Sequence, residues 1–451
     1  MIGSKFGGTS VADATAIRRT ADIINGRLDK QPIVVVSALS GATNALIAIA
    51  ELAAEGKLMP AIEQVEALRE RHLTTIAELL GTDANAQEHA ADESVLFDEL
   101  AHLVEALSVL GHLTPRSLDA MSSLGERLSA PIVAAAFVRA GIDAVLVDAR
   151  TVMKTNNDFG RAVPLPEMIA TACREHIAPL VKAGKVPVLG GYIGSTVDGV
   201  TSTLGRGGSD YSASLLGAAL GADAIEIWTD VDGLLTADPR VVPNARLIEH
   251  IRFDEASELA SFGAKVLHPN TITPAVQQGI PVFVFNSRRP EGTGTRITAD
   301  APRFPVRAIA GKENTVIVKV TSASMVATPG ALRAIFGVFE QNRMSVDVVT
   351  TSEVSVSVTV DDDKNLDAVV AQLRQHGEVG IERSRGIVAL VGSGLGESSP
   401  TMARAIAAIG DVRLHMLSLS ATGINLTLIV DGDQVKPVMR QLHAAFFEGA
   451  A

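Results

Sequence analysis

A cluster of glycine, hydroxyl and lysine residues near the N-terminus is suited to binding an anion. Residues 4–10 read Ser-Lys-Phe-Gly-Gly-Thr-Ser and precede a predicted helix at 14–27. Glycines and small hydroxyl residues before a helix present backbone N–H groups and the positive end of the helix dipole to an anion. Lys5 adds a mobile charge for a phosphoryl oxygen. No G-x-x-x-x-G-K-[ST] occurs in the chain, so this is not a Walker P-loop. A glycine turn beside a solvated lysine is the alternative.

A second cluster follows the apolar run at 32–37 and contains the hydroxyl groups of Ser37 and Thr43. It reads Ser-Ala-Leu-Ser-Gly-Ala-Thr-Asn over residues 37–44. Ligands of open α/β sheets bind at the carboxyl ends of the strands, so the first two clusters could face one crevice. Simple helix capping by Ser40 or Thr43 remains the alternative.

The densest cluster is Leu-Gly-Arg-Gly-Gly-Ser-Asp at residues 204–210, which precedes an apolar helix at 213–220. Its glycines let backbone amides approach a ligand, and Arg206 can bind a carboxylate through two parallel hydrogen bonds. Asp210 stands where a helix N-cap belongs, so capping is its alternative role. Capping alone needs neither the arginine nor three glycines.

Two further segments carry charged residues after predicted strands. Thr229-Asp230 ends a strand and could hold a ribose or an adenine edge, with Arg240 close enough in sequence to meet phosphates. The Asp-Gly and Asp-Pro pairs in the same stretch also form ordinary turns, which is the competing interpretation. Residues 262–269, Phe-Gly-Ala-Lys-Val-Leu-His-Pro, supply a second lysine, Lys265. His268 precedes a proline and is interpreted as structural rather than as a base.

Composition limits the classes of partner. The chain has 451 residues, a net charge of −12 and 47% hydrophobic residues, and at roughly 150 residues per domain we expect two to four domains. No sequence-wide basic field attracts nucleic acid or anionic lipid, and no apolar run reaches the roughly 18 residues that span a bilayer. The single cysteine, Cys173, excludes an intramolecular disulfide, and no zinc motif occurs, so no protein-held metal is expected. We therefore expect a soluble cytosolic protein with no nucleic-acid or membrane partner.

The elements that must position these clusters alternate between strand and helix. Short apolar runs recur at 32–37, 143–148, 185–189, 225–228 and 281–285. Between them lie helical patterns, one of which places Val95, Leu96, Leu100, Leu103, Leu107 and Leu110 at helical spacing. This alternation predicts an α/β fold with a mostly parallel sheet sandwiched by helices. Turn formers at 288–294 and 301–305 place a domain boundary near 298–306.

Beyond that boundary the pattern changes and repeats itself. The first unit has predicted strands at 315–320, 345–350 and 354–360 and helices at 331–342 and 366–375. The second has strands at 387–391, 412–418 and 424–430 and helices at 401–408 and 435–447. Two such βαββα units predict a pair of small ferredoxin-like α+β modules. The predicted domains are 1–297 (catalytic), 306–384 (first module) and 385–451 (second module). A glycine turn at 392–396 resembles a dinucleotide fingerprint, but its third glycine is misplaced.

Taken together, the motifs resemble the aspartate kinases of the amino-acid kinase superfamily. K-F-G-G-T-S-V, V-S-A-x-S-G-x-T-N, G-R-G-G-S-D, W-T-D-V-D-G and F-G-A-K-V-L-H-P occur here in that family's order, and the tandem modules look like ACT domains. The resemblance implies transfer of the ATP γ-phosphoryl group to the β-carboxylate of L-aspartate, giving 4-phospho-L-aspartate on the route to lysine, threonine and methionine. Mg²⁺ would be carried with the nucleotide. The β-carboxylate has a reference pKa of about 3.9, so no general base is required.

The resemblance also implies roles for individual positions. Those at ATP are Lys5, Gly7, Gly8, Thr229, Asp230, Arg240 and Lys265. Those at aspartate are Ser37, Thr43, Glu126, Arg206 and Ser209, of which Glu126 would meet the ammonium group and Arg206 the carboxylate. Lys5, Asp210 and Lys265 would be the catalytic residues, with Asp210 orienting Lys5. Leu235 stands where some relatives have a tyrosine at the nucleotide, which leaves the adenosine contacts open.

The tandem modules imply feedback by an end-product amino acid, with lysine favoured. The matching positions are Met325, Thr328, Ser345, Val346, Asp347, Ser352 and Glu353. Asp347 and Glu353 are suited to a lysine ammonium group. Ala331 replaces a bulky aromatic of the lysine-sensitive branch, so threonine, joint control and weak feedback stay open. ACT pairs associate across subunits, which implies a homodimer or homotetramer.

Two other functions compete with an aspartate kinase. One is a kinase for a different amino acid or carboxylate, which a substrate panel would identify. The other is a catalytically inactive amino-acid-binding regulator, which detectable turnover would exclude.

Overall fold

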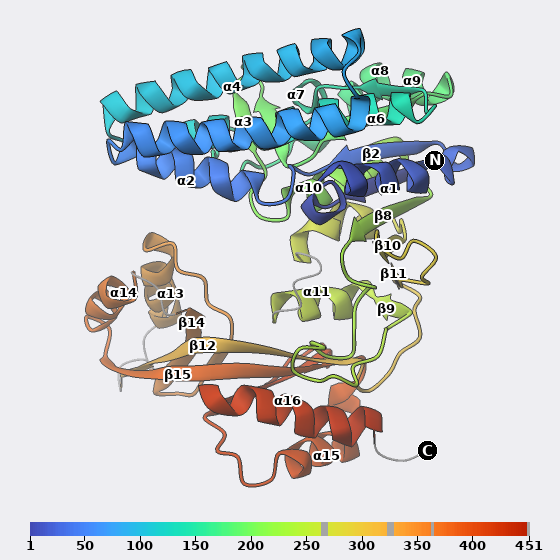
Figure 1. Ribbon diagram of the computed structural model, residues 1–451. Coiled ribbons are helices and arrows are strands. Elements are labelled where there is room, and N and C mark those ends of the chain that lie inside the picture. The colour runs from blue at the N-terminus through green and yellow to red at the C-terminus, as the bar shows by residue number, and fades with distance from the viewer. Residues whose placement is uncertain (263–268, 323–328, 362–364, 449–451) are drawn as a thin grey trace. The chain divides into compact units, whose positions relative to one another are not determined.

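The computed structural model describes residues 1–262, 269–322, 329–361 and 365–448 (Figure 1). The chain forms two compact units, one containing 1–234 and 266–300 and the other containing 235–265 and 301–451. Residues 235–265, which the sequence analysis assigned to the catalytic domain, therefore group with the C-terminal unit. Each unit is built around its own sheet.

The sheet of the first unit is mostly parallel, as predicted. Its strands run in the order β3-β5-β2-β1-β8-β10-β11. Their bounds are β1 Ile2–Phe6, β2 Pro32–Val36, β3 Ala144–Leu146, β5 Val186–Gly190, β8 Ala224–Thr229, β10 Val282–Asn286 and β11 Thr295–Thr298. Only β11 pairs antiparallel. The continuous apolar run of β2 is buried at every position because helices cover both faces of the sheet.

Helices of the first unit contact both faces of this sheet. Phe6 and Val36 point into the core formed with α1 (Ala14–Asn25) and α6 (Leu124–Arg139). Side chains alternate along a strand, so odd positions of β1 point the other way. There, a Cβ on Gly3 would lie 3.6 Å from the Ala213 carbonyl oxygen of α10 (Gly208–Leu220). Lys5 shares the parity of Gly3 and therefore faces α10.

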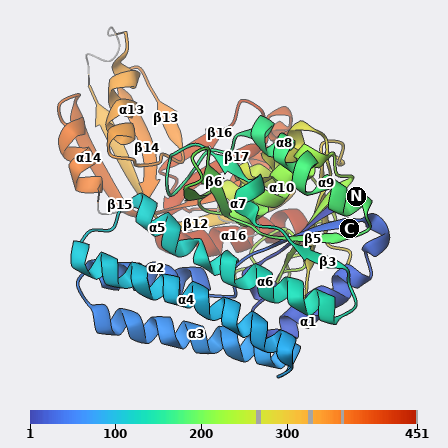
Figure 2. The same ribbon diagram turned by 90° about the horizontal axis from the view of Figure 1, so that it is seen from above.

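Three further helices stack beside the sheet. Figure 2 shows α2 (Ala42–Ala54), α3 (Leu58–Leu80) and α4 (Ala84–Leu110) lying side by side, and their facing side chains form one core with α1 and α6. The remaining helices are α5 Pro115–Ser122, α7 Ala149–Val152, α8 Pro166–His176, α9 Ala178–Lys182 and α12 Thr273–Gln277. A small second sheet contains β4 Lys154–Thr155, β6 Ile193–Thr196 and β7 Thr201–Thr203.

The C-terminal unit contains an antiparallel sheet in the order β13-β14-β12-β15-β17-β16. Two long strands, β12 (Ala308–Thr321) and β15 (Glu378–Val391), run through both modules. Residues 308–312 of β12 pair with 387–391, and residues 315–321 pair with 378–385. The pairing shifts near residues 312–317, where Asn314 and Ser384 have positive φ angles of 61° and 56°. The second module is thus completed by residues 308–312, which precede the first predicted strand of the first repeat in sequence.

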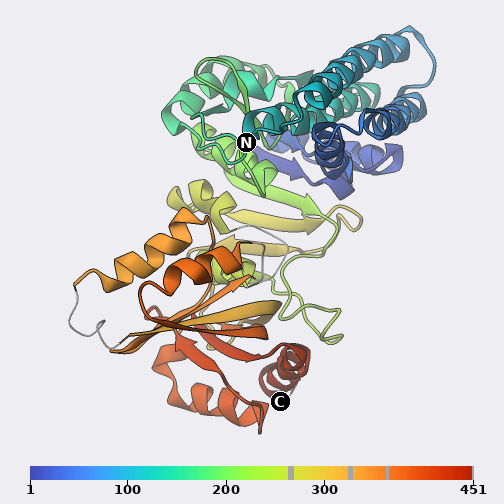
Figure 3. The same cartoon turned by 90° about the vertical axis from the view of Figure 1, so that its left-hand side faces the viewer.

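Each module has its own pair of helices, and Figures 1 and 3 show the two pairs on opposite faces of the sheet. Helices α13 (Ala331–Gln341) and α14 (Leu366–Leu373) cover one core, and α15 (Ser399–Ile409) and α16 (Val435–His443) cover the other. The remaining elements are α11 Phe253–Ser261, β9 His250–Arg252, β13 Val349–Thr351, β14 Ser355–Asp361, β16 Met416–Leu419 and β17 Asn425–Asp431. Strands β13 and β16 are shorter than predicted because 345–348 and 412–415 are irregular.

Candidate functional site

Neighbouring strands of the first unit end at the same level, which brings the predicted loops together. Phe6 at the end of β1 is in register with Val36 of β2 and Trp228 of β8. The next residues continue the hydrogen bonding, since the Ser37 amide donates to the Phe6 carbonyl (3.0 Å) and the Gly7 amide to the Trp228 carbonyl (3.0 Å). This carboxyl edge is where open α/β sheets bind their ligands.

Lys5 and Asp210 form an ion pair at this edge. Lys5 Nζ lies 2.6 Å from Asp210 Oδ1, and each side chain is 11% exposed. Asp210 is in the first turn of α10, whose N-cap is Gly207 in the left-handed conformation, so Asp210 does not cap the helix. A Cβ on Gly7 would lie 3.5 Å from Lys5 Nζ, which places the ammonium group beside the glycine loop.

The first two predicted clusters touch each other at Gly8. A Cβ on Gly8 would lie 3.1 Å from the Ala38 carbonyl oxygen, so this close approach favours glycine. Gly7 already donates its amide to Trp228, whereas Gly8 and Thr9 open a 3₁₀ turn (Gly8–Ser10). Amides at the start of a helical turn have no partner within the turn, so those of Gly8 and Thr9 are candidates to donate to an anion.

Glu126 on α6 is a buried carboxylate with an unfilled hydrogen-bonding capacity. Glu126 is 3% exposed, and its Oε1 accepts a hydrogen bond from the Ala38 amide at 3.1 Å. Oε2 has no hydrogen-bond partner among the described residues. Burial raises the pKa of Glu126 to about 8, against the opposing effects of the Ala38 N–H and the Lys5 charge. A buried carboxylate in this state requires a cationic partner to remain ionised.

Two of the predicted hydroxyl residues, Thr43 and Ser209, pack close to glycines. A Cβ on Gly125 would lie 3.6 Å from Thr43 Oγ1, and one on Gly191 would lie 2.7 Å from both Cα and Cβ of Ser209. Gly191 directly follows β5, and its amide donates to the Val36 carbonyl (2.8 Å). Ser37 is half-buried one residue after β2. These contacts gather the three hydroxyl residues beside α6 and α10.

Arg206 lies on the loop between β7 and α10, flanked by Gly205 and Gly207 at φ angles of 75° and 73°. Its side chain is exposed, and no ion pair or hydrogen bond holds its guanidinium among the described parts of the chain. An exposed guanidinium with no partner among the described residues is able to bind the carboxylate of a ligand through two hydrogen bonds.

The residues predicted to contact the nucleotide do not all lie in the first unit. Thr229 ends β8 and its hydroxyl approaches Asp230 Oδ1 at 3.3 Å. Asp230 is exposed at the same sheet edge. Arg240 belongs to the C-terminal unit, where it pairs with Asp238 (2.6 Å). Lys265 lies outside the described residues.

Sequence reasoning missed Tyr192, which lies in the loop between β5 and β6. Its φ angle is 64°, unusual for a residue with a Cβ. A Cβ on Gly208 would meet its ring at 2.8 Å, so the ring covers the start of α10. Burial raises the pKa of its hydroxyl, and the nearby Glu126 charge raises it further. The sequence feature that could have pointed to Tyr192 is the Gly190-Gly191 pair, which directly follows a predicted strand.

The predicted effector residues lie in the first module. Ser345, Val346 and Asp347 precede β13, and Ser352 and Glu353 form the turn to β14. Asp347 pairs with Lys312 at 2.7 Å, and Lys312 also pairs with Asp361 at 2.7 Å. Met325 and Thr328 lie outside the described residues.

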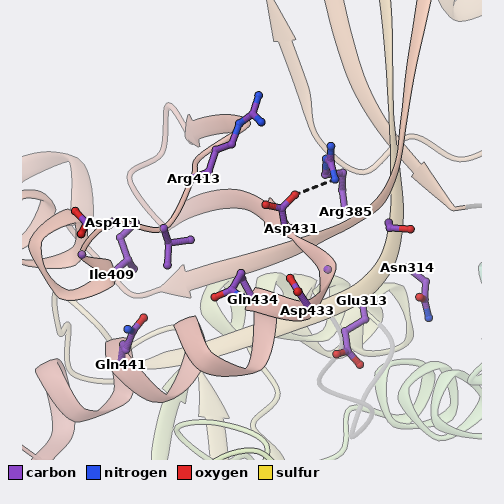
Figure 4. A pocket seen from close by; sticks show the side chains of 14 residues that line it. Glu313, Asn314, Arg385, Ile409, Asp411, Arg413, Asp431, Asp433, Gln434 and Gln441 are labelled. Atoms are coloured by element: carbon purple, nitrogen blue, oxygen red, sulfur yellow. Dashed lines mark ion pairs between the residues drawn. The ribbon is translucent and has the colours of Figure 1, made fainter.

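A separate cavity of roughly 980 Å³ opens in the second module (Figure 4). An ion pair of 2.9 Å between Arg385 and Asp431 crosses part of it, and Arg413 and Asp433 also line it. None of the predicted catalytic or effector residues that the structure describes lines this cavity. No described helix is long and apolar enough to cross a membrane, and in the same residues no three acidic, histidine or cysteine side chains gather as metal ligands.

Comparison with known proteins agrees with this geometry. The model of the amino acid kinase family matches residues 4–286, and that of an ACT domain matches residues 318–375. Lysine-sensitive aspartokinase 3 of Escherichia coli (strain K12) is 36% identical over 464 residues, covering 99% of each chain. The chain belongs to the aspartokinase family. Aspartokinase 3 of Arabidopsis thaliana chloroplasts is 35% identical over 98% of this chain and 81% of its own.

Solved aspartokinases share the fold. The E. coli aspartokinase III in complex with aspartate and ADP superposes with a TM-score of 0.88 at 36% identity, covering 99% of this chain and 100% of that one. The same protein with lysine and aspartate gives a TM-score of 0.82. The predicted amino-acid kinase fold with C-terminal ACT domains and the predicted aspartate kinase activity are thereby confirmed.

Proposed function

We propose that this aspartokinase binds L-aspartate between Glu126 and Arg206 and places its β-carboxylate beside Lys5. The observation that supports this most is Glu126, a buried carboxylate with one oxygen unpartnered among the described residues. An α-ammonium group would complete it, and Arg206 would bind the α-carboxylate through two hydrogen bonds. The side chain of the amino acid is then left free to react.

The reaction needs positioning and positive charge rather than a base. An oxygen of the ionised β-carboxylate attacks the γ-phosphorus of ATP, the bond from that phosphorus to the β–γ bridging oxygen breaks, and ADP leaves. No proton has to move, because the attacking carboxylate is ionised at pH 7. The barrier arises from bringing two anions together, so charge that acts on the transferring group lowers it.

Lys5 is the described residue best placed to supply that charge. Its ammonium group lies beside Gly7 and is held by Asp210 at 2.6 Å. The amides of Gly8 and Thr9 would bind phosphate oxygens, and Mg²⁺ carried with ATP would supply further positive charge to the phosphates. We assign Thr229, Asp230, Arg240 and Lys265 to the nucleotide as well, on the family resemblance.

Steady-state kinetics of two variants test the assignment. Arg206→Met should raise the aspartate KM by roughly 10²-fold, equivalent to about 2.7 kcal/mol, with the ATP KM little changed. Lys5→Ala should lower kcat by roughly 10²-fold or more with a smaller change in the aspartate KM. An unchanged aspartate KM in Arg206→Met, or an effect of Lys5→Ala on KM alone, would contradict the proposed roles.

We propose lysine as the feedback effector, bound in the first ACT module near Asp347 and Glu353. The E. coli relative is named lysine-sensitive, and one of its structures contains lysine. In this chain Asp347 already binds one alkylammonium group, that of Lys312. Threonine is the alternative because of Ala331.

We also propose a homodimer or homotetramer formed through the ACT modules. Leu417 and Leu419 are 41% and 38% exposed on β16, and their i, i+2 spacing puts them on one face of the strand. Paired exposed apolar side chains of this kind favour contact with another protein surface. Light scattering of the full chain would measure the mass, and a monomer at micromolar concentration would contradict the proposal.

A further inference from the structure

Asp119 on α5 has a dense set of hydrogen bonds although no role above requires it. Its residue is 1% exposed. Oδ1 accepts from the Thr203 hydroxyl (2.6 Å) and the Gly160 amide (3.0 Å). Oδ2 accepts from the Thr203 amide (3.0 Å) and the same Gly160 amide (2.9 Å). The carboxylate therefore binds two chain segments that are far apart in sequence.

Those two segments lead directly to the Arg206 loop. Thr203 is the last residue of β7, three positions before Arg206. The segment after Gly160 lies against the same loop, because a Cβ on Gly205 would be 3.2 Å from the Gly160 carbonyl oxygen. The Ala162 amide also donates to the Thr203 carbonyl at 2.8 Å. Asp119 accepts hydrogen bonds from both segments, the one at Gly160 and the one at Thr203.

The same hydrogen-bond network includes Tyr192, in the loop between β5 and β6. Tyr192 hydrogen-bonds through its hydroxyl to the side chains of Ser122 and Thr203, and its carbonyl accepts from the Leu204 amide at 2.9 Å. Ser122 is on α5, less than one helical turn after Asp119. The end of β7 is thus held from α5 and from the Tyr192 loop together.

Helix capping does not account for Asp119. The N-terminus of α5 is capped by Thr114, which forms a capping box with Ser117. Burial raises the pKa of Asp119, and the hydrogen bonds from Thr203 and Gly160 oppose that rise. No ion pair with a lysine or arginine is formed by Asp119 within the described ranges. A buried carboxylate whose partners are all neutral donors costs free energy. We therefore expect such a carboxylate where its hydrogen bonds fix the positions of the donor groups.

We propose that Asp119 is a positioning residue for aspartate binding, which fixes the end of β7 so that Arg206 is presented to the substrate carboxylate. This inference rests on the proposed role of Arg206. It assigns Asp119 no contact with aspartate, ATP or the reacting atoms. Its loss should therefore weaken aspartate binding through the loop and leave the nucleotide side unaffected.

Asp119→Asn tests this with little change in volume. An asparagine amide has one acceptor oxygen, and its NH₂ group would face the N–H of Gly160 or Thr203. We expect the aspartate KM to rise about 10-fold, while kcat and the ATP KM stay within about 3-fold of wild type. Thr203→Val, which keeps both amide bonds to the carboxylate, should give a smaller rise, and Thr203→Ser should restore wild-type behaviour.

The control variant is Glu93→Gln, which changes a carboxyl that is 2% exposed on α4. It should leave the aspartate KM unchanged. If Asp119 acts through Arg206, the double variant with Arg206→Met should have an aspartate KM no higher than that of Arg206→Met alone. A lower melting temperature with an unchanged aspartate KM in both Asp119→Asn and Thr203→Val would overturn the inference. Failure of Arg206→Met itself to raise KM would instead overturn the proposed aspartate site.

Discussion

Glu126 and Lys5 lie at the same strand ends but obtain their charge states in different ways. Lys5 is compensated by Asp210 within the chain, at 2.6 Å. Burial raises the pKa of Glu126 to about 8, because it outweighs the Ala38 amide, the backbone N–H of Glu126 itself and the more distant Lys5 charge. In the proposed complex, the aspartate ammonium group would supply the positive charge that compensates the ionised Glu126. Substrate binding and ionisation of Glu126 are then linked.

This linkage predicts the pH dependence of aspartate use. The Glu126 carboxyl is mostly protonated below about pH 8 in the free enzyme, and the ammonium group needs the ionised form. Since kcat/KM reports ionisations of the free enzyme, kcat/KM for aspartate should rise from pH 6.5 to 9 with an apparent pKa of about 8. Glu126→Gln should raise the aspartate KM and abolish that rise. The same rise in Glu126→Gln would contradict the assignment.

At the residue scale, the motifs named candidates in several loops that the structure brings to one sheet edge, but the local geometry of those loops could not be read from the motifs. Asp210 has the composition and position of an N-cap, yet Gly207 takes the cap and leaves its carboxylate for Lys5. That outcome depends on strand parity, which points Lys5 toward α10. Asp119 and Tyr192 belong to no motif, because their importance comes from contacts between segments far apart in sequence, 41 and 84 residues apart for the bonds of Asp119 to Gly160 and Thr203.

At the scale of elements, helix α4 shows how periodicity can identify a helix and place only part of its buried face. In the predicted pattern Leu100 and Leu107 are buried, whereas Val95 and Leu110 are 65% and 71% exposed. The buried face also contains Phe97, Val104 and Glu93, which the pattern did not include. A hydrophobicity pattern alone cannot place an acid on the buried face.

Glu93 and His72 give the α3–α4 pair a distinctive pH dependence of stability. Burial raises the pKa of Glu93 to about 9 and lowers that of His72 to about 4. The folded state holds the Glu93 proton more tightly, so Glu93 reduces stability as pH rises from about 4.5 to 9, by at most about 1.4 kcal/mol per pH unit. His72 acts oppositely from about pH 4 to 6.5, because there the unfolded state binds the extra proton.

The two effects should cancel between about pH 4.5 and 6.5 and leave the Glu93 effect above that window. Relative to wild type, Glu93→Gln should gain stability steadily from pH 6.5 to 9, as measured by the difference in melting temperature at each pH. Hydrogen exchange of α3 and α4 would localise the change. A pH-independent difference between the two proteins would show that Glu93 is not titrating in this range.

The long strands of the ACT modules could not be read from the sequence. The repeat was visible from 315 and from 387 onward, but residues 308–312 precede the first repeat while pairing with the second module. Gly311 in this stretch weakens a strand prediction. In the structure a Cβ there would lie 2.4 Å from the Met439 sulfur of α16, so close packing favours glycine. Tertiary contact, not local propensity, determines this strand.

At the scale of the whole molecule, the feedback proposal predicts which amino acid inhibits. Lysine should reduce kinase activity, and Asp347→Asn should raise the lysine concentration for half inhibition about 10-fold or more, because a carboxylate partner of the ammonium group is lost. Glu291→Gln, in the first unit, serves as a control with one charge removed elsewhere. Inhibition by threonine, or lysine inhibition unaffected by Asp347→Asn, would reassign the effector or its site.

The most direct test of the account is formation of an acyl phosphate from L-aspartate, dependent on ATP and Mg²⁺ and trapped with hydroxylamine. Wild-type protein should yield aspartyl hydroxamate, and Lys5→Ala should yield roughly 10²-fold less per unit time, while Glu93→Gln should match wild type. Product from a different carboxylic amino acid but none from aspartate would contradict the proposed substrate site. If neither aspartate nor another carboxylic amino acid gives a product, the proposed catalysis at the strand ends is contradicted altogether.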